Sequence, residues 1–165
     1  MHEHELRCCQ SVLRPYASVK DVLVNDPGSL FHDATRAAVT HAHDLVTTLK
    51  ATFAGHEVDR DVTIDVTSVD LSGRPPSAQL LPAVALSFAW HATSARSLFP
   101  SMRAELTVYP LSPEDTQLDL HGWYTPPGGA FGDVADALAG HRIAEATVQR
   151  FLDDIVERLA PTGAA

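Results

Sequence analysis

Residues 123–138 read WYTPPGGAFGDVADAL and mark the point where the last predicted strand gives way to a helix. Pro126 and Pro127 end the strand, because proline supplies no backbone donor to a sheet. The glycines that follow permit a sharp turn into the helix. Phosphate-binding loops read G-x-G-x-x-G or G-x-x-x-x-G-K-[ST], whereas Gly128, Gly129 and Gly132 form G-G-x-x-G with no lysine after it. The stretch therefore predicts a strand-to-helix turn rather than a nucleotide site.

The segment after this turn, residues 130–160, has the pattern of one long amphipathic helix. Apolar residues recur at steps of three and four, and Pro161 follows the last of them. At 1.5 Å per residue such a helix is about 45 Å long. We expect one face of it to cover a sheet. Its apolar positions are Phe131, Val134, Leu138, Ala144, Val148, Phe151, Leu152, Ile155 and Leu159.

Upstream of this helix, apolar and polar residues alternate, which is typical of strands with one buried face. Alternating runs cover 83–92, 102–109 and 117–124, and two further runs at 48–53 and 62–67 predict a hairpin. The inward positions expected from these runs are Leu49, Ala51, Phe53, Val62, Ile64, Val66, Val84, Leu86, Phe88, Trp90, Ala104, Leu106, Val108, Leu118, Leu120 and Tyr124.

The N-terminal part predicts a strand over 6–14, a short helix that ends at Asp26 and a second helix over 29–39. The expected order is a strand, two short helices, about five strands and one long helix. Burial of both apolar faces then requires an α+β fold, in which a curved antiparallel sheet wraps around the long C-terminal helix. A chain of 165 residues suits a single domain over 1–165, with its core at about 6–160.

Three stretches of the chain resemble a known family. SVLRPYASVKDVLVNDP (11–27) is similar to the first strand, proline and first helix of the START-like superfamily, also called SRPBCC. LHGWYTPPGGAFG (120–132) and HRIAEATVQRFLDDIVERL (141–159) look like the last turn and the closing helix of that family. The resemblance follows the order of elements over nearly the whole chain, and its motifs are signatures of a fold rather than of catalysis.

This resemblance implies a helix-grip fold with a deep, mostly apolar cavity between the sheet and the long helix. Members of the superfamily bind lipids, sterols, polyketides, hormones and other apolar ligands. Some catalyse cyclisation or aromatisation in that cavity, and one branch assists chaperones. The fold therefore leaves the function open between several classes.

Charge and composition favour some partners over others. Twelve Lys and Arg against 21 Asp and Glu leave a net charge of −9, which repels nucleic acid and anionic lipid. The start MHEHELR lacks the cationic and apolar regions of a signal peptide, and no run is long enough to span a membrane. We expect a cytoplasmic protein without membrane insertion, and a homodimer stays open. Cys8 and Cys9 are adjacent and form no disulfide framework.

The expected inward face is apolar and almost free of ionisable groups, which favours binding over acid–base catalysis. We therefore predict a site for a small hydrophobic or amphipathic ligand, lipid-like or polyketide-like, whose polar end meets Tyr124 or a residue at the mouth. The same pattern also fits a solid core without a cavity. The residues predicted to line the site are Phe88, Trp90, Leu106, Leu120, Tyr124, Phe131, Leu138 and Phe151.

Two other functions stay open. A polyketide cyclase or dehydratase would need a buried acid, base or arginine in the same cavity, with a shifted pKa. A protein-interaction module would instead have a closed cavity and an apolar outer patch, for example around Trp123. Nine histidines invite a metal site, but His41 and His43 lack a third ligand at a suitable spacing. We expect neither a metal nor a cofactor, and we identify no catalytic residue.

Overall fold

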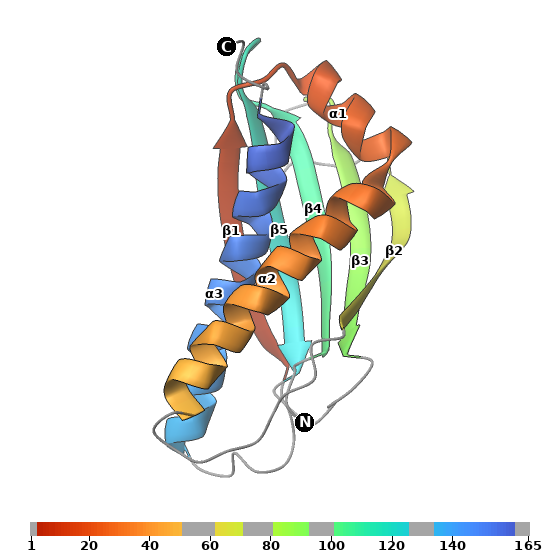
Figure 1. Cartoon of the computed structure of the whole chain (residues 1–165). Helices are drawn as coiled ribbons and strands as arrows, with labels where there is room; N and C mark the ends of the chain where they lie inside the picture. The colour runs from red at the N-terminus through yellow and green to blue at the C-terminus, as the bar shows by residue number, and fades with distance from the viewer. Residues whose placement is uncertain (1–2, 51–61, 71–80, 93–100, 126–133, 161–165) are drawn as a thin grey trace.

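The computed structural model describes residues 3–50, 62–70, 81–92, 101–125 and 134–160 (Figure 1). Strands and helices follow one another as an α+β chain that ends in a long helix. In chain order the elements are β1 (His4–Val12), α1 (Tyr16–Asn25), α2 (Pro27–Lys50), β2 (Val62–Asp70), β3 (Val84–Ala92), β4 (Ser101–Pro110), β5 (Thr116–Thr125) and α3 (Val134–Leu159).

The five strands form one antiparallel sheet in the order β1-β5-β4-β3-β2. The first two strands of the chain thus lie at opposite edges, and the later three fill the space between them. Helices α2 and α3 both lie on one face of the sheet, with α2 running obliquely across it (Figure 1). This arrangement is the helix-grip architecture expected from the sequence.

Alternation of side chains along the strands decides which face the helices cover. In β3 the side chains of Val84, Leu86, Phe88 and Trp90 are buried, whereas the residues between them are only partly buried. The same alternation holds in β5 from Leu118 to Tyr124. Because neighbours along a strand point to opposite faces, the predicted inward positions of these strands form one continuous apolar surface.

The second helix differs most from the sequence prediction. It was expected over 29–39 but runs for 24 residues to Lys50, so the predicted strand over 48–53 is wrong for its first three residues. Leu45 and Leu49 continue the helical spacing that begins at Leu30, and alternation over so few residues cannot separate the two periods. The rest of that predicted strand, with Ala51 and Phe53, lies outside the described residues.

The long C-terminal helix is confirmed as α3, which has 26 residues. Among the side chains of α3 that the structure describes, the buried ones are Ala144, Val148, Phe151, Leu152, Asp154, Ile155 and Leu159. In the described parts of the chain, no helix has the length and apolarity that a membrane span requires.

Candidate functional site

The inner face of the sheet is built from rows of side chains that cross the strands. Pairing places Trp90 opposite Met102, Met102 opposite Tyr124, and Tyr124 opposite His4, so these four form one row across β3, β4, β5 and β1. The row lies where β3 ends and β4 begins. Three of its members are buried, and His4 at the edge is exposed.

The next row is Phe88, Ala104, Gly122 and Leu6. Small residues at its centre leave space above β4 and β5. Gly122 shows how this space is used, because an added Cβ there would lie 3.2 Å from Leu6 Cδ1 and 3.3 Å from Met102 Sδ. Leu6 and Met102 therefore fill the hollow over the glycine.

The helices approach the sheet mainly at its edges. Helix α2 packs on β2, α3 packs on β1, and the two helices pack against each other. Over the central strands, large side chains therefore bridge the distance between helices and sheet. Helix α1 contacts β4, and its buried residues Val19 and Leu23 belong to the same core.

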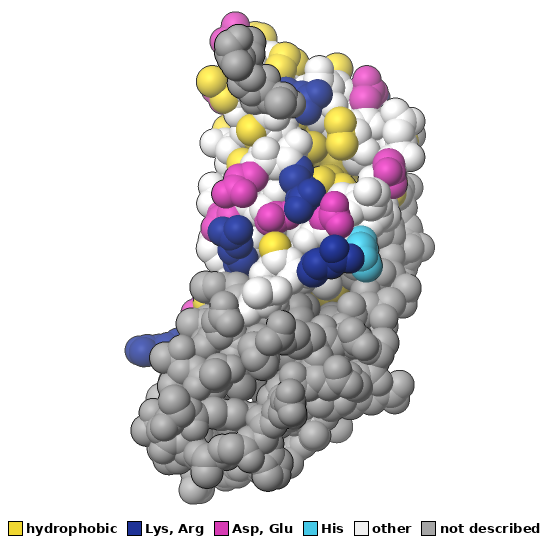
Figure 2. All heavy atoms as spheres, in the orientation of Figure 1, with side chains coloured by type: hydrophobic (Ala, Val, Ile, Leu, Met, Phe, Trp, Pro, Cys, Tyr) yellow, Lys and Arg dark blue, Asp and Glu magenta, His cyan; other side chains and the backbone are white. Residues whose placement is uncertain are grey.

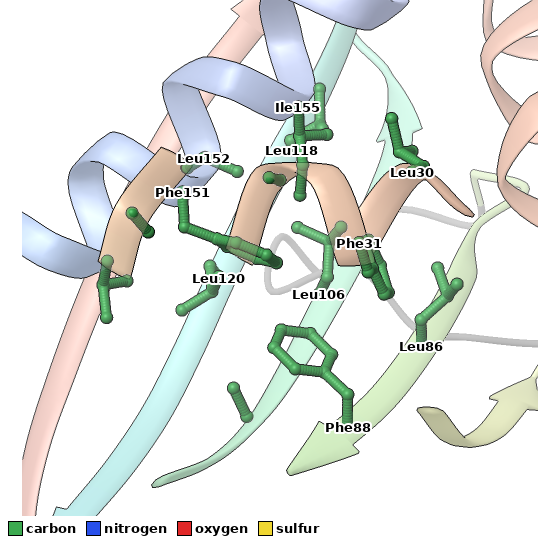
Figure 3. Packing of buried hydrophobic residues seen from close by; sticks show 14 of the residues in the cluster. Leu30, Phe31, Leu86, Phe88, Leu106, Leu118, Leu120, Phe151, Leu152 and Ile155 are labelled. Atoms are coloured by element: carbon green, nitrogen blue, oxygen red, sulfur yellow. The ribbon is translucent and has the colours of Figure 1, made fainter. Parts of the chain in front are cut away.

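Four aromatic rings fill this bridged space. Phe31 from α2, Phe88 from β3 and Phe151 from α3 point toward one another (Figure 3), with ring centroids 5.1 to 5.7 Å apart. Trp90 contacts Phe151 edge to face at 4.7 Å and lies 6.0 Å from Phe88. Such tilted and edge-to-face arrangements are favourable for aromatic pairs. At this level the inner space is a packed core.

The indole of Trp90 has a polar partner within the apolar surroundings. Its Nε1 donates a hydrogen bond of 3.2 Å to Thr35 Oγ1, and both residues are buried. A buried donor without a partner costs about 1–3 kcal/mol. The bond therefore holds the indole in one orientation relative to α2.

Tyr124 is the ionisable side chain of the predicted site. It is 2% exposed and stacks on His4, with ring centroids 5.3 Å apart. Burial, helped by the negative charge of Glu145, raises the pKa of the Tyr124 phenol. The phenol is therefore protonated at neutral pH and can act as a hydrogen-bond donor.

The surroundings of Cys8 disfavour the reactive form of its thiol. Cys8 lies on the inner side of β1 and is half-buried, whereas Cys9 is exposed. Burial is the main cause that raises the pKa of the Cys8 thiol to about 11. Since the thiolate is the reactive form, Cys8 is a weak nucleophile at neutral pH. Within the described residues, no group of three or more His, Cys, Asp or Glu side chains could hold a metal ion.

The structure brings six of the eight predicted lining residues onto one buried surface. Phe88, Trp90 and Phe151 are in mutual ring contact, Leu106 is paired with Leu120, and Tyr124 lies two residues further along β5 from Gly122. That these residues contact a ligand stays a prediction. Phe131 lies outside the described residues.

Leu138 lies in α3, but its side chain is not among those that the structure describes. Sequence reasoning did not place Phe31 or Thr35 at the site. A signal was present, because Thr35 follows Phe31 by four residues and so shares the apolar face of its helix.

The outer face of the sheet is polar around Trp123. The guanidinium of Arg103 lies 5.1 Å from the centre of the Trp123 ring, and the His121 ring lies 4.0 Å away on the same strand. Arg103 also pairs with Glu3 at 2.9 Å. These contacts partly cover the indole. On the helix side, acidic and basic side chains are intermixed over the described part of the surface (Figure 2).

No family model matches the chain, and no curated protein matches it. Solved structures similar to it include norcoclaurine synthase from Thalictrum flavum, in complex with dopamine and hydroxybenzaldehyde, with a TM-score of 0.47 and 10% identity. The alignment covers 95% of this chain and 86% of that one.

A second similar structure is the Zhui aromatase/cyclase from Streptomyces sp. R1128, with a TM-score of 0.44 and 14% identity over 96% of this chain and 94% of that one. A START superfamily protein from Mycobacterium smegmatis has a TM-score of 0.37 and 11% identity, over 94% and 99% of the two chains. At identities this low, the ligand or the activity of a similar protein cannot be transferred to this chain. The element order, the single antiparallel sheet and the two long helices on one face are those of the START-like, or SRPBCC, fold.

Proposed function

We propose that this protein binds a small hydrophobic or amphipathic molecule between the inner face of the sheet and helices α2 and α3. The observation that carries the proposal is the way the helices approach the sheet through its edge strands. Over the central strands an apolar space is thereby created, which only side chains or a ligand can fill.

The ligand would lie at the end of the sheet marked by the row of Trp90, Met102 and Tyr124. At the level of Phe31, Phe88 and Phe151 the aromatic rings already fill the space. The row next to them combines a large apolar surface with the phenol of a buried tyrosine. An apolar body would pack against Trp90 and Met102, while the polar end would accept a hydrogen bond from Tyr124.

The raised pKa of Tyr124 favours binding over acid–base catalysis. A phenol whose pKa lies above its usual value is a weaker acid. Its pKa is then far from the neutral range, in which proton transfer is most efficient. The same phenol is well suited to donate a hydrogen bond to a carbonyl or carboxylate. We therefore place the cyclase or dehydratase hypothesis second, and the interaction-module hypothesis third because Arg103 and His121 partly cover Trp123.

The test uses 11-(dansylamino)undecanoic acid, a fluorescent fatty-acid probe, together with native mass spectrometry of the purified protein. We expect saturable binding of the probe, and an apolar adduct or displacement of the probe by long-chain fatty acids. A Trp123→Phe background leaves Trp90 as the only tryptophan, so its emission should change when the probe binds. Absence of both the adduct and the binding would refute the proposal.

The contact with Tyr124 has its own control. Tyr124→Phe removes only the phenol oxygen, and we expect about three- to tenfold weaker binding of the probe because one hydrogen bond is lost. Tyr109→Phe is the matched control, since the hydroxyl of Tyr109 donates to Asp119 and not to the inner face. Equal effects of the two substitutions would show that Tyr124 does not meet the polar end.

A further inference from the structure

Among the described residues, strand β1 is paired along one edge only. Its partner β5 occupies that edge in a continuous register from His4 opposite Tyr124 to Val12 opposite Thr116. In the described parts of the chain no strand pairs with the other, open edge. Proteins protect such edges with bulges, prolines, charged side chains or a covering helix. Residues 4–12 contain no bulge, proline or lysine, and the charged Glu5 and Arg7 pair with each other. By contrast, the other edge strand, β2, has a register shift between Val66 and Ser68.

A shallow hollow of about 380 Å³ lies between β1 and α3. Figure 1 shows α3 running beside β1 on the helix side of the sheet. The residues that α3 supplies are three or four positions apart, so they form one stripe along the helix. A strand edge thus forms one wall and a helix stripe the other. The lining residues are Leu6, Arg7, Cys8, Arg142, Glu145, Ala146 and Gln149.

The charge of this hollow differs from that of the whole chain. Two arginines and one glutamate line it, whereas the chain has a net charge of −9. Arg7 is engaged by Glu5 at 2.8 Å, so an acidic group in the hollow would be met mainly by Arg142. Between the charged side chains, the partly exposed Ala146 offers apolar surface beside Leu6, which is 5% exposed. The groove therefore suits a partner that combines an apolar side chain with a carboxylate.

We propose that β1 and α3 form a docking groove for an extended acidic peptide. The peptide backbone pairs with the open edge of β1 as an additional strand, which is a general mode of peptide recognition. One of its apolar side chains enters the hollow over Leu6 and Ala146, and a carboxylate lies at Arg142. The groove borders the proposed ligand space, because Leu6 also covers Gly122 on the inner face. The proposal for the groove does not rest on ligand binding in that space.

The position of α3 favours a single peptide strand over a second copy of the chain. Pairing of β1 with β1 of a second copy would follow a two-fold axis through the open edge, with the helices of both copies on the same face. Because α3 packs directly on β1, the two α3 helices would then compete for the space above that edge. A lone strand carries no helix layer and avoids this conflict.

The probe is a fluorescein-labelled, end-capped peptide of eight residues, Thr-Val-Thr-Glu-Thr-Val-Thr-Glu, in which valine and glutamate lie two positions apart and so share one face of a strand. We expect its fluorescence anisotropy to report a Kd of about 100 µM or tighter. Methylation of alternate backbone nitrogens removes donors that a strand needs, so that version should bind at least about tenfold more weakly. The same peptide with lysine in place of each glutamate should show no saturable binding.

Two substitutions test the groove on the protein side. Arg142→Glu reverses the charge that meets the carboxylate, and Ala146→Phe fills the hollow. We expect each to weaken binding of the valine–glutamate peptide at least about tenfold. Arg150→Glu makes the same charge change on α3 away from the lining, so binding should stay within about twofold. Circular dichroism checks that every variant is folded.

Amide hydrogen exchange distinguishes strand pairing from charge attraction, because only pairing protects the backbone amides of β1. Saturation with the peptide should slow exchange in β1 more than in β2. The proposal is overturned if the peptide does not bind at 1 mM (roughly −4 kcal/mol), if its N-methylated form binds equally, or if Arg142→Glu and Arg150→Glu have equal effects. A dimer in sedimentation that Ala146→Phe abolishes would assign this edge to a second copy and overturn it as well.

Discussion

Gly122 is the smallest residue on the inner face of the sheet, and its lack of a side chain has a packing role. Leu6 from β1 and Met102 from β4 lie over it, both within 3.5 Å of where a Cβ would be. The sequence alone places a glycine between Leu120 and Tyr124 on an apolar face, but it does not show what fills the space. Leu6 on β1 and Met102 on β4 fill this space, and only the tertiary structure shows it.

Substitution of this glycine should destabilise the fold. In Gly122→Ala the new methyl group crowds Leu6 and Met102, and we expect the free energy of unfolding to fall by about 1–2 kcal/mol. Gly28→Ala is the control, because nothing lies within 4 Å of its Cβ and alanine favours a helix by about 0.5–1 kcal/mol. Urea unfolding should therefore give opposite signs; a stabilising Gly122→Ala would contradict the packing described.

At the scale of elements, polar contacts fix α3 against both the sheet and α2. Gln10 of β1 donates to Asp153 at 2.7 Å, and Arg14 donates to the carbonyl of Leu159 at 2.9 Å. Arg158 donates to the buried Asp154 on its own helix and to Asp33 on α2. These contacts hold the C-terminal half of α3 in place next to the apolar side chains that it buries.

Arg158→Ala should loosen this connection. It leaves the carboxylate of Asp154, a buried residue, without its charged partner, and we expect a loss of about 1–2 kcal/mol in the free energy of unfolding. Asp33→Ala removes only the half-exposed pair with Arg158, and should cost about 0.5 kcal/mol or less. Thermal and urea unfolding measure both variants. Equal losses in the free energy of unfolding for the two variants would show that the contact between Arg158 and Asp154 adds no stability.

The elements themselves were predictable to different degrees. Strands β3, β4 and β5 and helix α3 show many repeats of one period, so local pattern was sufficient for them. The sequence prediction ends helix α2 too early because Thr48, Lys50 and Thr52 alternate with Leu49, Ala51 and Phe53 over a few residues. A β-branched residue also lowers helix propensity. In the folded chain, packing of α2 on α3 outweighs this local preference.

For the whole molecule, the aromatic cluster joins the sheet to both long helices. Phe151 of α3 contacts Phe31 of α2 and both Phe88 and Trp90 of β3, and its side chain is fully buried. The sheet and both long helices therefore contact one another through the Phe151 ring. Its removal would leave a cavity that the surrounding rings can close only in part.

Phe151→Ala should lower the free energy of unfolding by about 3–5 kcal/mol, through lost burial and the remaining cavity. Leu13→Ala is the control, because Leu13 is 69% exposed and should change stability by about 0.5 kcal/mol or less. Chemical denaturation followed by circular dichroism measures both. A loss below 1 kcal/mol (about a fivefold change in the equilibrium constant) for Phe151→Ala would mean that this ring is not central to the core.

The sequence by itself determined which side of each strand is apolar and which stripe of α3 is buried, because both patterns depend on local periods of 2.0 and 3.6 residues. Tertiary structure decided which of these surfaces meet. Trp90 finds its hydrogen-bond partner 55 residues away in Thr35, and Arg142 reaches the same hollow as Leu6 only because α3 packs on β1. Contacts across such separations depend on how the layers pack, and no local period encodes them.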